Sequence, residues 1–118
     1  MIKIPYLSVI RFGGADAGDF LHNQLSNDVL GLARGDSVFA CYCEPKGRVL
    51  ALMLVGRVGE DYYAVMASSL LESVTNRLRM YVLRSKVNVE VLEQMAVAGI
   101  EGESIANAEE LATVVSLP

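Results

Sequence analysis

The sequence has few of the residues on which self-contained catalytic chemistry depends. It contains no tryptophan, three prolines, two cysteines and a single histidine, His22. No serine or cysteine lies at a spacing from His22 that identifies a catalytic triad, so a surface position is the favoured interpretation. The glycines form neither a dinucleotide-binding fingerprint nor a phosphate-binding loop. Kinase and dehydrogenase functions are therefore excluded.

Long hydrophobic runs are also missing, although 53% of the residues are apolar. The longest run, 49–55, is far shorter than the ~20 residues that span a bilayer. The first residues lack the apolar segment and cleavage site of a secretory signal. Cys41 and Cys43 have neither disulfide spacing nor the second ligand pair of a zinc site, so two residues packed in a strand are expected. These features predict a cytoplasmic protein with reduced cysteines and no membrane contact.

Positive charge is scarce and absent from the end of the chain. The net charge is −4, and all 10 lysines and arginines precede residue 91. Arg77, Arg79, Arg84 and Lys86 form a modest cluster, but there is no basic run. Phosphate contacts need clustered cations, so we expect that nucleic acid is not bound directly.

Hydrophobic periodicity predicts an α+β fold: an antiparallel sheet meander with two packed helices. At 118 residues, the chain has room for one buried core. Asp16 is placed to cap the first helix, and Ser68 or Ser69 to cap the second. The expected strands are 6–12, 37–44, 48–57, 62–66 and 86–92, with helices after Asp16 and after Ser69.

The sequence pattern of residues 95–118 predicts the start of a second, similar unit. A short strand at 95–100, a helix at 106–111 and a strand at 113–117 have a βαβ-like pattern. The final strand has no evident partner, which is unusual for a complete domain. We therefore expect two units, 1–94 and an incomplete 95–118, in a portion of a larger fold.

The strongest local signal is a hairpin turn at Pro45-Lys46-Gly47. Proline presets φ for a turn and glycine tolerates positive φ. Lys46 and Arg48 place two cations at this turn, where they could meet a carboxylate or a phosphate. The alternative, a solvated turn without a ligand, carries more weight on the residues alone.

Three sequence blocks, in this order and spacing, resemble the amino-terminal region of the YgfZ-type folate-binding proteins. These proteins are relatives of the glycine-cleavage T-protein, an aminomethyltransferase. The blocks are Phe20-Leu21-x-x-Gln24-Leu25-Ser26-Asn27-Asp28-Val29, Pro45-Lys46-Gly47-Arg48-Val49-Leu50-Ala51 and Leu78-x-x-Tyr81-x-x-Arg84-x-Lys86-Val87. The resemblance covers most of residues 5–100.

The resemblance implies tetrahydrofolate as the ligand, in a central cavity built by repeated units. It also implies a role in the assembly or maintenance of iron-sulfur proteins, which would be the clients. Tyr42, Lys46, Arg48 and Arg84 are the folate-binding residues that it favours here. Arg84 and Lys86 would suit the carboxylates of a polyglutamate tail.

This sequence departs from the family pattern in two places, and the first of them bears on catalysis. The T-protein has aspartates after the glycine of the hairpin, whereas this chain has Arg48-Val49-Leu50-Ala51. That strand holds no acid or base to move a proton, so a non-catalytic protein is favoured. The late Lys-Gly-Cys and Gly-Gln-Glu signature of the YgfZ branch is not in this sequence.

Two alternatives remain open. In a one-carbon transferase, Asp28, Asp36 or Glu44 would have to supply the missing carboxylate. In an interaction module, the apolar excess would be buried by self-association, with a homodimer as the expected state.

Overall fold

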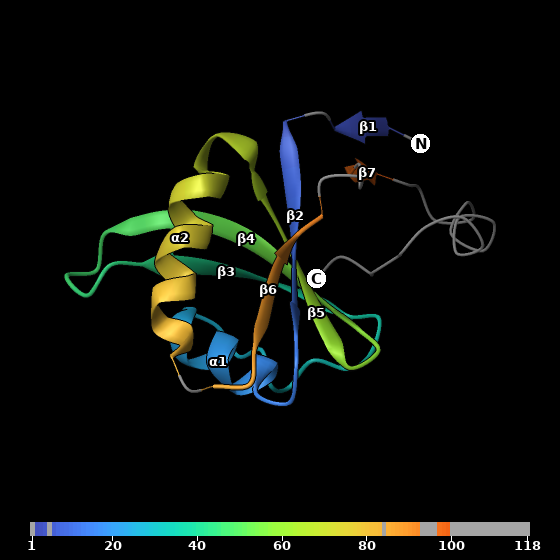
Figure 1. Cartoon of the computed structure of the whole chain (residues 1–118). Coiled ribbons are helices and arrows are strands. Elements are labelled where there is room, and N and C mark those ends of the chain that lie inside the picture. The colour runs from blue at the N-terminus through green and yellow to red at the C-terminus, as the bar shows by residue number, and fades with distance from the viewer. Residues whose placement is uncertain (1, 5, 84, 93–96, 100–118) are drawn as a thin grey trace.

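The computed structural model describes residues 2–4, 6–83, 85–92 and 97–99, which form two antiparallel sheets and two α-helices (Figure 1). The helices are α1 (Ala17–Gln24) and α2 (Leu71–Val82), and a 3-10 turn, η1 (Ser68–Leu70), leads into α2. The strands are β1 (Ile2–Ile4), β2 (Leu7–Gly13), β3 (Ser37–Cys43), β4 (Val49–Val58), β5 (Asp61–Ala67), β6 (Asn88–Val91) and β7 (Val97–Gly99). The predicted α+β class is confirmed.

The larger sheet has the strand order β3-β4-β5-β2-β6. Strands β3, β4 and β5 form the predicted meander, because short turns join each strand to its antiparallel neighbour. Strand β2 pairs with β5 on one side and β6 on the other. The second sheet consists of β1 and β7. Strand β7 lies within the predicted strand 95–100, but its pairing with β1 was not predicted.

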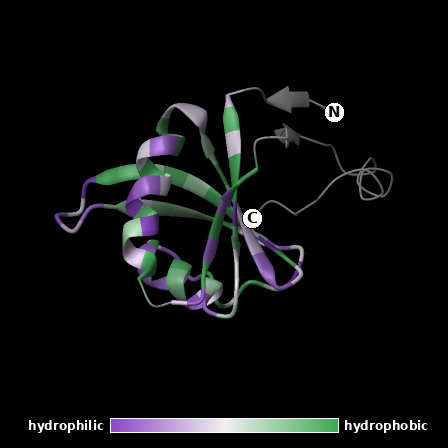
Figure 2. Ribbon diagram, viewed as in Figure 1, coloured by the Kyte–Doolittle hydropathy of each residue, from purple (hydrophilic) through white to green (hydrophobic). Residues whose placement is uncertain are grey.

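Both α-helices cover the same face of the larger sheet (Figure 1). Alternate residues of the strands face these helices, so Ala40, Ala51 and Met53 are almost fully buried. Figure 2 shows hydrophobic residues along the strands and hydrophilic residues on the β3–β4 turn. The largest fully buried side chains are Phe12, Ile10, Leu21, Met53, Met66, Leu78, Val29, Val55 and Val74.

The segment after α1 covers the outer edge of β3. Leu25 forms a bridge with Tyr42, and the Ser26 N–H donates to the Cys41 carbonyl at 3.0 Å. The Cys41 N–H donates to Ser26 Oγ at 2.8 Å, and Asn27 Nδ2 donates to the Phe39 carbonyl at 3.0 Å. The Ser-Asn part of the first sequence block therefore satisfies backbone groups that an edge strand would leave unpaired.

Asp16 occupies the N-cap position of α1 as predicted, whereas the N-cap positions of η1 and α2 are Ala67 and Leu70. Asp16 and Ser68 precede the helices, but neither α1 nor η1 nor α2 has a side-chain cap hydrogen bond. Asp16 is used in a tertiary contact with Lys86, and the Ser68 hydroxyl lies 2.6 Å from that of Ser8 on β2. Side chains that could cap a helix serve instead to join it to the sheet.

The predicted helix 106–111 and strand 113–117 lie outside the described residues, and the division into 1–94 and 95–118 stays a prediction. None of the helices formed by the described residues has the length and apolar content needed to span a bilayer.

Candidate functional site

The start of α1 and the segment before β6 cross in close contact. The Asp16 N–H donates to the Lys86 carbonyl at 3.1 Å, and the Lys86 N–H donates to Asp16 Oδ2 at 2.8 Å. Gly14 has φ +104, and a Cβ at this position would lie 2.2 Å from the Lys86 carbonyl oxygen. Only glycine fits this crossing, because the backbone is left-handed and the space is filled.

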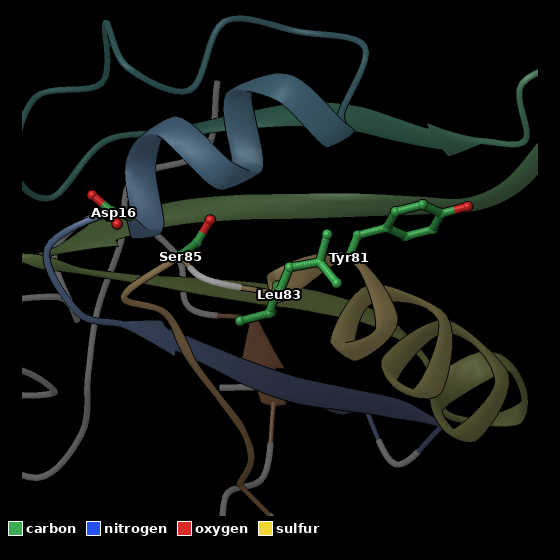
Figure 3. Close-up of a pocket in the computed structure, with 5 residues that line it drawn as sticks. Asp16, Tyr81, Leu83 and Ser85 are labelled. Atoms are coloured by element: carbon green, nitrogen blue, oxygen red, sulfur yellow. The ribbon is translucent and has the colours of Figure 1, made fainter.

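A hollow of about 650 Å³ lies beside this crossing and is lined by Asp16, Tyr81, Val82, Leu83 and Ser85. Figure 3 shows Asp16 and Ser85 at one end, Tyr81 at the other and Leu83 between them. The hollow is largely open to solvent, so a ligand there would lie in a surface depression rather than in an enclosed cavity. The hollow combines an aromatic ring and aliphatic side chains with a carboxylate and a hydroxyl. It is the candidate functional site.

Leu83 is in a strained conformation at this hollow. It has φ 46 and ψ −112 and is the only non-glycine residue with positive φ in the described part of the chain. Its side chain is 84% exposed, so burial of the side chain does not offset the strain. Backbone strain that burial does not offset is found most often at functional sites.

Tyr42 lies on β3 beneath α2 and is 2% exposed. Burial raises the pKa of its hydroxyl, and the Arg77 guanidinium, which interacts with that hydroxyl, opposes the shift. Tyr81 of α2 is close enough to raise the same pKa further. A ligand in the hollow would contact Tyr81 directly. It would not contact Tyr42, because side chains of α2 lie between them.

Lys46 and Arg48 lie on the predicted turn between β3 and β4, and both are exposed. The Glu44 N–H donates to the Arg48 carbonyl at 2.9 Å, and Gly47 has the expected positive φ of +91. The Arg48 side chain is 75% exposed and pairs with Glu44 at 3.4 Å. In Figure 1 the turn projects to the side of α2, whereas the hollow is lined by residues at the carboxyl end of that helix and by Asp16 before α1.

The structure therefore separates the sequence-predicted folate residues. Tyr42 is next to the candidate site, Lys46 and Arg48 belong to the hairpin tip, and Arg84 lies outside the described residues. Their role in folate binding stays a prediction. Lys86 is exposed, and its backbone forms the crossing described above.

The three carboxylates considered for a transferase do not belong to the candidate site. Asp28 Oδ1 accepts from the Gly31 N–H at 3.0 Å and lies 3.4 Å from His22 Nδ1. Glu44 pairs with Arg48, and Asp36 is exposed before β3. None of them lines the hollow. His22 is exposed on α1, as the sequence predicted.

Sequence reasoning missed the role of four residues of the site. Asp16 was expected to be a cap, Tyr81 a core residue, and Leu83 and Ser85 were not singled out. Tyr81 is 44% exposed because it follows the last buried turn of α2. The spacing Tyr81-x-x-Arg84 in the third sequence block was the one available signal. The strain at Leu83 has no signature in the sequence.

Metal binding has no support in the described residues, where no three His, Cys, Asp or Glu side chains are grouped so as to hold an ion. Cys41 and Cys43 are free thiols, both partly exposed. They occupy alternate positions of β3, as expected for residues packed on a strand.

The chain is similar to parts of longer known proteins. No family model matches the sequence. The chain is 31% identical over 103 residues to an uncharacterized protein of Haemophilus influenzae, covering 86% of this chain and 36% of that protein. It is 28% identical over 95 residues to the tRNA-modifying protein YgfZ of Hamiltonella defensa, covering 80% of this chain and 28% of that protein. It is 27% identical over 109 residues to the tRNA-modifying protein YgfZ of Photobacterium profundum, covering 86% of this chain and 33% of that protein.

Among solved structures, the chain is similar to the glycine cleavage system aminomethyltransferase T of Bartonella henselae. The TM-score is 0.73 at 20% identity, and the match covers 78% of this chain and 26% of that one. This likeness establishes a shared fold. The chain spans about a third of the length of the curated relatives that it matches.

Proposed function

We propose, from the premise that this chain is a YgfZ-type relative of the aminomethyltransferases, that it binds tetrahydrofolate without catalysing one-carbon transfer. It would act as the amino-terminal portion of a protein that supports the assembly or maintenance of iron-sulfur enzymes. The observation that carries the folate proposal is the hollow between Asp16 and Tyr81.

The chemistry of this hollow matches that of a reduced pterin. The pyrimidine ring of a reduced pterin is planar and carries an amino group beside a ring nitrogen, so it favours a flat apolar contact and a hydrogen-bond acceptor. Tyr81 supplies an aromatic ring, and rings of this kind stack on planar ligands. Asp16 supplies a carboxylate with Oδ1 in addition to the Oδ2 that Lys86 engages, and a carboxylate has about four acceptor positions.

The absence of transfer chemistry is supported by strand β4. The residues after the hairpin turn are Val49, Leu50 and Ala51, which can neither donate nor accept a proton. Asp28, Asp36 and Glu44 do not line the hollow. The competing proposal, a one-carbon transferase, would be favoured if Asp28→Asn or Glu44→Gln abolished a measured transfer activity.

Direct binding to nucleic acid is not part of the proposal. Four of the described arginines are paired with carboxylates: Arg11 with Asp61, Arg34 with Glu60, Arg48 with Glu44 and Arg57 with Glu60. Paired cations are less available to phosphates, and the net charge of −4 opposes a polyanion.

Calorimetric titration of folinate, a stable reduced folate, into the full chain tests the proposal. We expect saturable binding that weakens at least tenfold in Tyr81→Ala and is unchanged in the exposed helix variant Asn23→Ala. A loss in the Lys46→Ala, Arg48→Ala double variant instead would move the site to the hairpin tip. Absence of saturable binding to the folded chain would overturn the proposal for this segment.

A further inference from the structure

Arg77 of α2 differs from the other arginines of the described residues. Four of those arginines pair with carboxylates, and Arg79 donates to the Val89 carbonyl at 3.1 Å. Arg77 is half-buried, and no ion pair joins it to a carboxylate of the described residues. Arg11 and Arg57 are half-buried as well, and both have carboxylate partners. A guanidinium that is partly removed from water is stabilised by an anion, and here the described residues do not supply one.

The hydroxyl of Tyr42 positions the Arg77 guanidinium against the sheet. Tyr42 is 2% exposed, and its side chain is hydrogen-bonded to that of Arg77. A guanidinium donates up to five hydrogen bonds in a planar fork, and one phenol oxygen accepts only part of them. The remaining N–H groups are arranged to bind a carboxylate through two parallel hydrogen bonds.

Tyr81 connects Arg77 to the hollow. The two residues are four positions apart on α2, so they lie on the same side of the helix, about 6 Å apart along its axis. Helical side chains lean toward the amino end of the helix, which brings the Tyr81 ring toward Arg77. In Figure 3 Tyr81 points away from Asp16 and Ser85, which lie at the other end of the hollow. A ligand that extends from Asp16 past the Tyr81 ring would therefore reach Arg77.

The acids that are nearest in sequence to this cluster have other positions. Glu44 follows Tyr42 by two residues, but it pairs with Arg48 at 3.4 Å. Glu72 is exposed in the first turn of α2, and a separation of five residues places it on a different side of the helix from Arg77. Neither acid competes for the Arg77 guanidinium.

We infer that Arg77 binds a carboxylate of the ligand that occupies the hollow, one helical turn beyond the ring of Tyr81. This inference rests on the proposed function, because a folate joins its pterin through a benzoyl group to a glutamate with two carboxylates. With the pterin between Asp16 and Tyr81, the glutamate extends along α2. The sequence favoured Lys86 for such carboxylates, but the backbone of Lys86 contacts Asp16, at the opposite end of the hollow from Tyr81.

Calorimetric titration of two ligands into the full chain tests the inference. Folinate carries the glutamate, whereas 6-methyltetrahydropterin is a reduced pterin without it. We expect Arg77→Met to weaken folinate binding about tenfold or more, with an unchanged circular dichroism spectrum, and to leave the affinity for the pterin unchanged. Arg79→Met is the matched control, since it removes the same charge from an exposed side chain of the same helix and should change neither affinity.

The other outcomes separate this inference from the proposed function. Equal folinate affinity in wild type and Arg77→Met would overturn the inference and leave the proposed function standing. An equal loss of both ligands in Arg77→Met would also overturn it, because Arg77 would then shape the hollow instead of binding the glutamate. A loss of folinate in Lys86→Met instead would move the carboxylate to the other end of the hollow. If folinate did not bind to the folded wild type, the proposed function and the inference would both fail.

Salt dependence gives a second readout, and it decides the question if the pterin alone binds too weakly to measure. Raising the salt concentration from about 50 mM to about 500 mM screens an ion pair at this partly exposed site. We expect this change to weaken folinate binding severalfold in wild type and in Arg79→Met, and much less in Arg77→Met. The same salt dependence in all three proteins would overturn the inference.

Discussion

Asp16 Oδ2 accepts a hydrogen bond from the Lys86 N–H at 2.8 Å, between residues 70 positions apart in the sequence. The contact joins the start of α1 to the segment that leads into β6, and it forms one wall of the hollow. Asp16→Ala removes the acceptor and leaves the Lys86 N–H to water. We expect a loss of about 1 kcal/mol in the free energy of unfolding, measured by urea titration.

The matched control for this change is Asn23→Ala, since Asn23 is exposed on the same helix. A substitution of this kind normally changes stability by less than about 0.5 kcal/mol. If Asp16→Ala and Asn23→Ala had equal effects, the hydrogen bond to Lys86 would contribute nothing and α1 would be held by its apolar residues alone.

Gly14 is the tightest point of the same crossing. Gly14 and Gly47 have similar backbone conformations, with φ +104 and +91. A Cβ at Gly14 would lie 2.2 Å from the Lys86 carbonyl oxygen, whereas a Cβ at Gly47 meets nothing within 4 Å. Gly47→Ala should cost about 1 kcal/mol from backbone strain alone. Gly14→Ala should cost at least about 2 kcal/mol more, because the backbone segments around Gly14 and Lys86 must also move apart.

Thermal and urea unfolding of the two glycine variants, side by side, measures this difference. Equal losses in both variants would mean that the segment around Lys86 moves away freely. The hollow would then have one adjustable wall, and its volume in the folded protein would not be fixed.

The sequence predicted the sheet well because its signals are local. The meander of β3, β4 and β5 follows from the alternation of apolar residues and from the Pro45-Lys46-Gly47 turn. These signals lie within or next to the strands that they define. The position of β2 between β5 and β6 is a long-range property, and it depends on contacts such as that between Arg11 and Asp61. No pattern within either strand specifies that contact.

The candidate site was harder to predict for the same reason. Its lining comes from Asp16 near the beginning of the described sequence and from residues about 65 or more positions later, namely Tyr81, Val82, Leu83 and Ser85. Asp16 has the sequence context of a helix cap, and only the distant Lys86 gives it another role. Tyr42 was predicted as a folate-binding residue, and this role stays a prediction. Its burial beneath α2 could not be derived from strand periodicity.

Leu83 offers a test that separates stability from ligand binding. Leu83→Gly permits the observed φ of 46 without a Cβ clash and removes a side chain that is 84% exposed. We expect the free energy of unfolding to increase, by up to about 1 kcal/mol. Affinity for folinate should fall at the same time, because the apolar middle of the hollow is lost. Unfolding and calorimetry on one preparation measure both, and a destabilised variant would show that the Leu83 side chain supports the fold.

The hydroxyl of Tyr42 provides a prediction about alkaline pH. Burial raises its pKa in the folded protein above the ordinary value of about 10, despite the opposing effect of Arg77. The unfolded chain therefore loses this proton at a lower pH than the folded chain does. The resulting stability is fully present below about pH 10 and is lost as the pH rises through the folded pKa. Tyr42→Phe removes this titration and leaves the other four tyrosines unchanged.

Urea titrations at pH 8 and at several values above pH 10 compare the two proteins. At pH 8, Tyr42→Phe should be less stable by about 1 kcal/mol, since the interaction of the hydroxyl with Arg77 is lost. Above pH 10, the difference should shrink steadily, because only the wild type must either keep a costly proton or bury a charge beneath α2. A difference that stays constant across this range would mean that Tyr42 titrates as it does in water. The tyrosine would then have to be open to solvent, and accessible to a ligand, from the side of α2.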